Sequence, residues 1–248
     1  MVCEFVDKNI VICDYIKRGD CLKLMKDLPD KSVDVVFTSP PYNRLRNDAY
    51  DHYDDTVVNY FKLLTGFTDE SLRLAKDKVI VNLQQNYYNK SDIFKYFGRY
   101  ANNIAGIVIW SKTNPKPSRN YRESDNTRSI TNAYEYFVVL SQDGKCFRCY
   151  GDNNTLNHIS TSVNPDHVSN HHAVMRKDIC EWFIDKFTKE GDIVLDPFLG
   201  TGTTAVCAIE MNRHYIGFEI SQEYFNISLD RISQCLLQNK EPSINNAK

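Results

Sequence analysis

Short apolar segments alternate with helical patterns along this chain, and this alternation constrains its fold more than any other feature. The segments are rich in β-branched and aromatic residues and show no clean polar alternation, which is typical of strands buried on both faces. They occupy Ile10–Cys13, Val33–Phe37, Val79–Leu83, Ile104–Trp110, Tyr134–Leu140, Ile193–Leu195 and Tyr215–Ile220. Apolar residues at helical spacing are Val57, Phe61, Leu64, Leu72 and Ala75 and, near the end, Phe225, Leu229, Ile232 and Leu236. The pattern predicts an α/β fold with a doubly wound, mostly parallel sheet.

The length and composition of the chain favour one cytoplasmic domain. Its 248 residues suit a single hydrophobic core with small insertions, so we expect residues 1–248 to form one domain. No apolar stretch approaches the roughly 20 residues of a bilayer-spanning helix, and charges within Met1–Lys8 argue against an export signal. Most of the eight cysteines lie in apolar segments, where a reduced thiol packs as a small hydrophobic group. We therefore expect a soluble protein with no membrane association.

Cys146 and Cys149 have the spacing of two metal ligands. The histidines that follow them are His158, His167, His171 and His172. A zinc site of the usual kind needs a second pair of ligands at comparable spacing, which neither another cysteine pair nor the histidine intervals supply. We therefore predict no metal centre.

The overall charge gives the chain no general affinity for polyanions. Its formal net charge is −2, so contact with a polyanion has to come from local clusters. Basic residues concentrate between Trp110 and Ile130, around an Asn-Pro-Lys-Pro stretch that cannot form a regular helix. Taken alone, this cluster fits a solvated loop equally well.

A strand, a glycine turn and a helix start follow one another near the carboxyl end. The segment Ile193–Leu195 leads through an Asp-Pro-Phe turn to Gly200 and Gly202, after which a helical pattern begins. Glycines let the backbone approach a ligand, and the amides at a helix start favour a carboxylate or phosphate. Glu219 lies 19 residues after Gly200 at a strand end, where an acidic side chain receives ribose hydroxyls in nucleotide-binding folds. These features predict a nucleoside cofactor, with a nicotinamide cofactor or a purely structural turn as alternatives.

The segment Thr38–Asn43, Thr-Ser-Pro-Pro-Tyr-Asn, follows the buried segment Val33–Phe37. Two consecutive prolines hold the chain extended and remove amide donors, so carbonyl oxygens there are free to accept hydrogen bonds. The amino group of cytosine or adenine offers two N–H donors that Ser39 and Pro40 can accept, and Tyr42 offers a ring for stacking. Taken alone, the segment also fits an ordinary rigid turn. In a doubly wound sheet, both loops would lie at the carboxyl edge, where ligands bind.

Together the two loops resemble the permuted, beta-class DNA amino-methyltransferases, which modify the N4 of cytosine or the N6 of adenine. The resemblance extends from Gly19 to about Ile232, with the catalytic loop preceding the cofactor loop. It implies a Rossmann-like methyltransferase fold, S-adenosylmethionine as the methyl donor, and no metal. The residues that it implies for catalysis are Ser39, Pro40 and Tyr42, and those for the cofactor are Asp20, His172, Asp196, Phe198, Gly200, Gly202 and Glu219.

The resemblance also implies double-stranded DNA as the partner, with the target base flipped out and stacked on Tyr42. The chain lacks a separate recognition domain, so we expect insertions at 43–55, 112–130 and 141–170 to read the DNA. The predicted DNA-binding residues are Arg44, Arg46, Lys112, Lys116, Arg119 and Arg122. A homodimer and a companion restriction endonuclease are both compatible with the resemblance.

The first residue of the catalytic loop bears on the base that is modified. Within the family, serine at this position leans toward cytosine N4, whereas aspartate is commoner in adenine enzymes. We therefore expect a site-specific methyltransferase for cytosine N4, with adenine N6 as the alternative. RNA or a protein glutamine is less favoured, because an Asn-Pro-Pro-Tyr loop is usual there. The presence of both loops opposes an inactive, cofactor-binding subunit.

Overall fold

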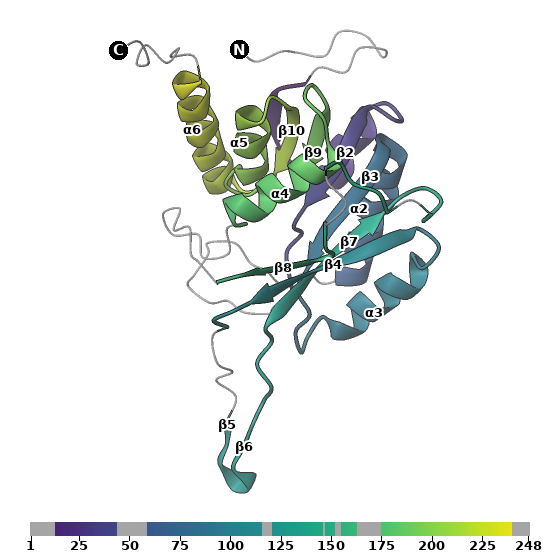
Figure 1. The fold of residues 1–248 in the computed structure, drawn as a ribbon, viewed down its shortest axis with the longest axis vertical. Coiled ribbons are helices and arrows are strands. Elements are labelled where there is room, and N and C mark those ends of the chain that lie inside the picture. Colours follow the sequence, from purple (N-terminus) through teal and green to yellow (C-terminus); the bar gives the residue numbers. More distant parts are fainter. Residues whose placement is uncertain are drawn as a thin grey trace.

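The computed structural model describes residues 13–43, 59–115, 121–145, 147–151, 155–162 and 175–239, and its centre is an eight-stranded sheet (Figure 1). The strands lie in the order β1-β10-β9-β2-β3-β7-β4-β8. They are β1 (Tyr15–Arg18), β2 (Val33–Thr38), β3 (Ala75–Leu83), β4 (Ile104–Lys112), β7 (Tyr134–Leu140), β8 (His158–Thr161), β9 (Ile193–Asp196) and β10 (His214–Glu219). Within this sheet only β7 runs antiparallel to its neighbours, so the predicted mostly parallel sheet is confirmed.

Helices cover both faces of the sheet (Figure 1). One face carries α1 (Cys21–Leu24), the 3-10 turn η1 (Met25–Asp27), α2 (Tyr60–Leu74) and α3 (Lys90–Arg99), and the other carries α4 (Lys177–Phe187), α5 (Thr203–Glu210) and α6 (Gln222–Gln238). Successive side chains of a strand point to opposite faces: Val36 packs on the α2 side, and Val35 and Phe37 pack on the α4 side. Both faces are apolar, which explains why the segments lack polar alternation. None of the described helices combines the length and apolar character needed to cross a membrane.

The parallel strands β1, β10, β9, β2 and β3 all end at one edge of the sheet. Strand β9 lies between β10 and β2, so the loops that follow these three strands are neighbours. The predicted catalytic loop follows β2, the predicted cofactor loop follows β9, and Glu219 ends β10. The fold therefore brings together segments from opposite ends of the sequence.

The observed elements differ from the predicted ones in a few places. Residues 10–12 lie outside the described residues, and the first strand that the structure describes is β1, which begins after Cys13. Ala75, predicted to be helical, begins β3 because it pairs with Val33 of β2. Helix α3 was not predicted, although the buried Ile93 and Tyr96 are three residues apart, as on one face of a helix.

The predicted recognition insertions are described in part. Most of 43–55 lies outside the described residues. Within 112–130, Lys112 ends β4, and residues 121–128 form a hairpin of β5 (Tyr121–Arg122) and β6 (Thr127–Arg128), with η2 (Glu123–Asp125) at its turn. This hairpin projects away from the sheet (Figure 1). Segment 141–170 contains β8, which pairs with β4 at the edge of the sheet.

Candidate active site

One buried hydrogen bond ties the loop after β2 to the loop after β9. The Thr38 hydroxyl donates to Asp196 Oδ1 at 2.6 Å, and these residues are 1% and 5% exposed. Thr38 ends β2 and Asp196 ends β9, two strands that pair in parallel. Residues 158 positions apart in the sequence thereby hold the predicted catalytic loop beside the predicted cofactor loop.

Asp196 organises the cofactor loop from within. Besides the contact with Thr38, its Oδ2 accepts from the Thr204 hydroxyl at 2.6 Å and its Oδ1 from the Phe198 amide at 3.0 Å. Burial raises the pKa of the Asp196 carboxyl above its usual value, and these hydrogen bonds oppose the rise. The sequence predicted that Asp196 binds the cofactor. In the structure, both of its carboxyl oxygens accept hydrogen bonds from groups of the protein.

Gly200 and Glu219 meet at the predicted cofactor site. The Gly200 amide donates to Glu219 Oε2 at 2.8 Å, and the Ser221 amide donates to Oε1 at 2.7 Å. Gly200 and Gly202 have φ of 55° and 87°, in the left-handed region that favours glycine. A Cβ at Gly200 would meet no atom within 4 Å, so a ligand can approach this backbone, whereas one at Gly202 would lie 3.0 Å from Ser228 Cβ. Burial is the main cause of a raised pKa of the Glu219 carboxyl.

Asp20 and Phe198 flank these residues. A 2.8 Å hydrogen bond from the amide just before Asp20 to the Glu219 carbonyl places Asp20 beside the end of β10. Asp20 Oδ1 accepts from the Leu22 amide at 2.9 Å and so caps α1. The Phe198 ring packs edge-on against Phe67, with ring centroids 5.1 Å apart. The structure thus gathers Asp20, Phe198 and Glu219 at the carboxyl ends of three neighbouring parallel strands.

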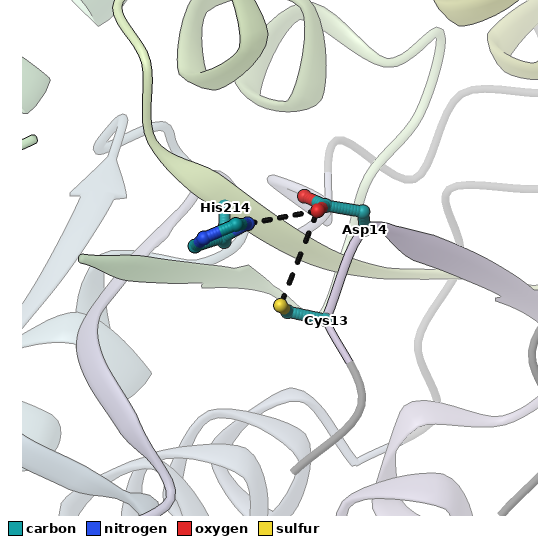
Figure 2. A group of neighbouring side chains, drawn as sticks. All are labelled: Cys13, Asp14 and His214. Carbon is teal, nitrogen blue, oxygen red and sulfur yellow. Dashed lines mark hydrogen bonds and ion pairs between the residues drawn. The ribbon is translucent and has the colours of Figure 1, made fainter. Parts of the chain in front are cut away.

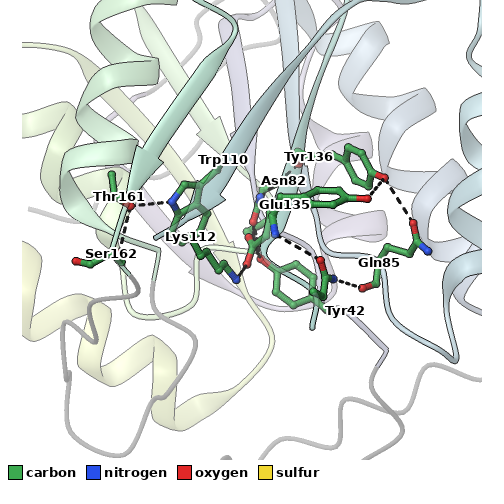
Figure 3. A network of polar contacts seen from close by, with 12 residues as sticks. Tyr42, Asn82, Gln85, Trp110, Lys112, Glu135, Tyr136, Thr161 and Ser162 are labelled. Carbon is green, nitrogen blue, oxygen red and sulfur yellow. Dashed lines mark hydrogen bonds and ion pairs between the residues drawn. The ribbon is translucent and has the colours of Figure 1, made fainter. Parts of the chain in front are cut away.

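Polar side chains of the catalytic loop contact Asn82 of β3 and Glu135 of β7, and Figure 3 shows Tyr42 beside both. Asn82 Oδ1 accepts from the Ser39 hydroxyl at 3.1 Å and from the Tyr42 hydroxyl, and the two hydroxyl oxygens are 3.1 Å apart. The Tyr42 hydroxyl also donates to Glu135 Oε2 at 3.2 Å. Pro40, between the two hydroxyl residues, is buried. The predicted catalytic residues therefore lie together, with both hydroxyls bound to groups that accept hydrogen bonds.

Glu135 is also paired with a cation (Figure 3). Lys112 Nζ forms an ion pair with Glu135 Oε1, and the two side chains are only 12% and 5% exposed. The same ammonium lies 5.0 Å from the ring centroid of Trp110, whose indole N–H donates to the Thr161 hydroxyl at 2.8 Å. The sequence predicted that Lys112 contacts DNA, but the structure places its charge against a buried carboxylate, which needs such a partner.

Four residues of the site had no role predicted from the sequence: Asn82, Asn86, Asn89 and Glu135. Asn82 follows the buried apolar run of β3 and Glu135 precedes that of β7, and a buried polar residue in such a strand signals a hidden partner. Asn86 and Asn89 donate to the Tyr42 carbonyl at 2.9 and 2.7 Å and so fix the end of the catalytic loop. The loop is held at both ends, by Asp196 before it and by two amides after it.

The remaining predicted site residues are on the surface or outside the described residues. Arg122 lies on the projecting hairpin, with a side chain that is 74% exposed and an ion pair of 3.3 Å to Asp125. The predicted residues that fall outside the described part are Arg44, Arg46, Lys116, Arg119 and His172. Of the two predicted DNA-binding residues that the structure describes, Lys112 is paired with Glu135 and Arg122 is accessible.

A separate group of possible metal ligands lies at the opposite edge of the sheet (Figure 2). Cys13, Asp14 and His214 each place one ligand atom within 4.8 Å of the others. His214 Nδ1 lies 2.8 Å from Asp14 Oδ2, and Asp14 Oδ1 accepts from the Tyr215 amide at 3.3 Å. These contacts join the start of β10 to the residue before β1, so they link two strands. Cys146, considered above as a zinc ligand, is outside the described residues.

The sequence matches a known family over most of its length. The family model, described as DNA methylase of the N6 and N4 type, matches residues 33–230, which include both loops and Glu219. This chain belongs to the DNA methylase family. The type II methyltransferase M.HinfI of Haemophilus influenzae is 26% identical over 260 residues, which cover 88% of this chain and 68% of the relative. The type II methyltransferase M2.DpnII of Streptococcus pneumoniae is 24% identical over 258 residues, which cover 94% and 93%.

Solved structures of DNA methyltransferases share the fold of this DNA methylase. The cytosine-N4-specific PvuII DNA methyltransferase matches with a TM-score of 0.72 and 20% identity, covering 91% of this chain and 93% of that one. The complex of M1.HpyAVI with S-adenosylmethionine has a TM-score of 0.61 and 23% identity, covering 88% and 98%. The putative DNA modification methylase TTHA0409 of Thermus thermophilus, complexed with S-adenosyl-L-methionine, has a TM-score of 0.63 and 19% identity, covering 89% and 95%.

These matches confirm the predictions of family, fold and chemistry. The protein is a DNA amino-methyltransferase with a Rossmann-like fold, and its family uses S-adenosylmethionine as the methyl donor. The order of the two loops along the chain is the permuted one predicted from the sequence.

Proposed function

We propose that this DNA methylase transfers a methyl group from S-adenosylmethionine to the N4 amino group of a cytosine flipped out of duplex DNA at a specific site. The observation that carries the proposal is the 2.6 Å hydrogen bond between Thr38 and Asp196, which joins the loop for the base to the loop for the cofactor. Direct transfer requires the reacting atoms to be aligned at about 3–3.5 Å. Loops anchored at neighbouring strand ends supply such proximity.

The residues at the ends of β1, β9 and β10 fit this cofactor. The open side of the Gly200 backbone leaves room for a ligand, and Glu219 and Asp20 are acidic groups that accept hydrogen bonds. In the proposed complex, Glu219 accepts the ribose hydroxyls, Asp20 accepts from the adenine amine, and Phe198 packs against the nucleoside. When bound, S-adenosylmethionine supplies an electrophilic methyl group on a sulfonium sulfur, and transfer of that group leaves S-adenosylhomocysteine.

The catalytic loop supplies alignment for the amine. The nitrogen of an exocyclic amino group is a poor nucleophile, because its lone pair is delocalised into the ring. Ser39 and the Pro40 carbonyl accept its two N–H groups and orient the lone pair toward the methyl carbon, and Tyr42 stacks on the flipped base. A C–N bond forms as the C–S bond breaks, and the amine then releases one proton to solvent. Alignment of this kind is worth several orders of magnitude in rate.

The preference for cytosine rests on Ser39. Serine at this position resembles the loop of the cytosine enzymes of the family, and the PvuII enzyme, which is named as cytosine-N4-specific, has the same fold. Adenine N6 is the second candidate, because both bases present an amino group to the same acceptors. RNA, a protein glutamine and a catalytically inactive role are disfavoured by the Ser-Pro-Pro-Tyr loop beside an intact cofactor loop.

The surface that reads the DNA sequence is proposed to include the hairpin of β5 and β6. Its projection from the sheet and the exposure of Arg122 support contact with phosphates or a groove. Segments 43–55 and 141–170, with Arg44 and Arg46 in the first, would complete this surface. A homodimer and a companion restriction endonuclease stay predictions.

Expression in a methylation-free host tests the proposal directly. The host DNA is sequenced by a method that reports modified cytosine and adenine at single-base resolution, with an empty plasmid and Glu219→Ala as controls. We expect N4-methylcytosine at one short recurrent motif in cells that carry the wild-type protein and none in the controls. If the host DNA carries N6-methyladenine instead, the target is adenine N6, the second candidate. Unmodified DNA from a protein that binds S-adenosylmethionine would refute the proposal.

A further inference from the structure

Asn82 is a fully buried polar residue of β3 that accepts hydrogen bonds from both hydroxyls of the catalytic loop. Figure 3 shows it beside Tyr42. Its neighbours along the strand, Val81 and Leu83, are apolar and equally buried. Burying an amide costs about 1–3 kcal/mol unless hydrogen bonds offset the loss of water. A leucine of similar shape would satisfy the packing of the core, so packing alone does not explain an amide at this position.

The oxygen of Asn82 determines where the hydroxyl proton of Ser39 points. A serine hydroxyl carries one proton and two lone pairs. When Ser39 donates that proton to Asn82 Oδ1 at 3.1 Å, its lone pairs remain available to accept from an amino group. Without this acceptor, the hydroxyl can rotate and direct its proton at the N–H groups of the base, which repels them.

Asn82 Oδ1 can accept from both loop hydroxyls at the same time, because an amide oxygen has two lone pairs, and Glu135 is a second acceptor for Tyr42. Tyr42 lies 3.2 Å from Glu135 Oε2, and Glu135, which is ion-paired with Lys112, accepts hydrogen bonds only. The Tyr42 hydroxyl, whose shortest contact is with Asn82 Oδ1, thus lies between two acceptors, and neither of them offers a proton to Ser39. The amide itself is oriented by its Nδ2, which donates to the Tyr136 carbonyl at 3.4 Å and so turns the oxygen toward the catalytic loop.

We propose that Asn82 is a positioning residue for methyl transfer, which holds the Ser39 hydroxyl as an acceptor for the amino group of the target base. Asn82 acts through Ser39 and not by contact with the base. The inference rests on the proposed function, because it concerns the amine that this function places at Ser39. It adds to the active site a residue on β3, which is followed by neither the catalytic loop nor the cofactor loop.

Substitution of Asn82 by leucine removes the acceptor with little change in volume. We expect Asn82→Leu to lower kcat by about 10²-fold, since one correctly placed hydrogen-bonding group at a reacting centre is worth about 10²–10³ in kcat. The Kd for S-adenosylmethionine, measured by calorimetry, should change little. Asn82→Asp keeps an oxygen at the same distance from the backbone, but it loses the donor to Tyr136 and adds a carboxylate near Glu135, so we expect it to recover only part of the activity that Asn82→Leu loses.

A double-mutant cycle separates positioning from a merely structural role. Ser39→Ala and Asn82→Leu are measured singly and together, on unmethylated genomic DNA. If Asn82 acts through Ser39, the double variant is no slower than the slower single variant. If Asn82 only supports the core, the losses in kcat caused by the two substitutions multiply in the double variant. The unfolding temperature then falls by the same amount whether or not Ser39 is present.

Several results would overturn the inference. These are an Asn82→Leu variant with wild-type kcat, losses that multiply in the cycle, or a fall in cofactor affinity as large as the fall in kcat. Should Asn82→Leu fail to fold, Asn82→Thr replaces it in the cycle, because threonine suits a strand and its hydroxyl ends one bond short of the amide oxygen. The wild-type protein is assayed first. If it is inactive, the proposed function fails together with the inference, whereas an active wild type with multiplying losses refutes the inference alone.

Discussion

The bond between Thr38 and Asp196 can be removed with almost no change in shape. Thr38→Val replaces the hydroxyl by a methyl group, and because both residues are buried, water cannot easily supply the lost donor. A hydrogen bond to a charged group contributes about 1.5–3 kcal/mol. A domain of this size shifts its Tm by about 2–4 °C for each kcal/mol. We therefore expect the Tm of Thr38→Val to be about 3–12 °C below that of the wild type.

Thr68→Val is a matched control for this substitution. Thr68 is also fully buried, and its hydroxyl lies 3.0 Å from that of Tyr96 on the α2 side of the sheet. The partner is neutral, so the expected loss is only about 0.5–1.5 kcal/mol. Urea unfolding followed by circular dichroism gives both free energies of unfolding, and calorimetry gives the affinity for S-adenosylmethionine. We expect Thr38→Val, and not Thr68→Val, to weaken cofactor binding, because only Thr38 holds the cofactor loop.

The pH dependence of the loss identifies the carboxylate as its cause. Burial raises the folded-state pKa of Asp196, so its contribution to stability is present at low pH and is lost as the pH rises through that pKa. Thr38 stabilises the ionised form, so Thr38→Val should cost most at neutral pH and less as acid protonates Asp196. A loss no larger than that of Thr68→Val, or one that does not change between neutral and mildly acidic pH, would refute this reasoning.

Other expected outcomes concern the cofactor, the base and the DNA. Because burial raises the pKa of Glu219, acidification should protonate it and weaken S-adenosylmethionine binding; a titration of Kd against pH checks this, and Glu219→Gln should bind weakly with a flatter profile. Tyr42→Ala should lower kcat far more than it raises the cofactor Kd, and wild-type turnover would exclude a stacking role. Arg122→Ala should reduce the slope of log affinity for DNA against log salt by about one, with the cofactor Kd unchanged, as measured by fluorescence anisotropy; an unaltered slope would remove Arg122 from the DNA interface.

Local patterns explain why so much of the fold could be predicted. A strand buried on both faces needs an uninterrupted apolar segment, and a cofactor turn needs glycine at positive φ, so β2, β9 and the Gly200 turn are each visible in a few consecutive residues. The signals were weaker where a pattern was short or mixed. Helix α3 and strand β8 were missed because exposed charged or polar residues interrupt their few buried positions.

By itself the sequence determined the parallel sheet, the family, and the two loops at the carboxyl edge of the sheet, because each depends on residues that are contiguous in the chain. Only the tertiary structure decided which polar groups pair with one another. Asp196 accepts hydrogen bonds from Thr38 and Thr204, and Lys112 forms an ion pair with Glu135. Asn82 accepts hydrogen bonds from Ser39 and Tyr42. The physical reason is that a buried polar group needs a hydrogen-bond or ion-pair partner, and in most of these cases the partner comes from the neighbouring strand or the loop that follows it. Strand order, and not order along the chain, chooses that neighbour.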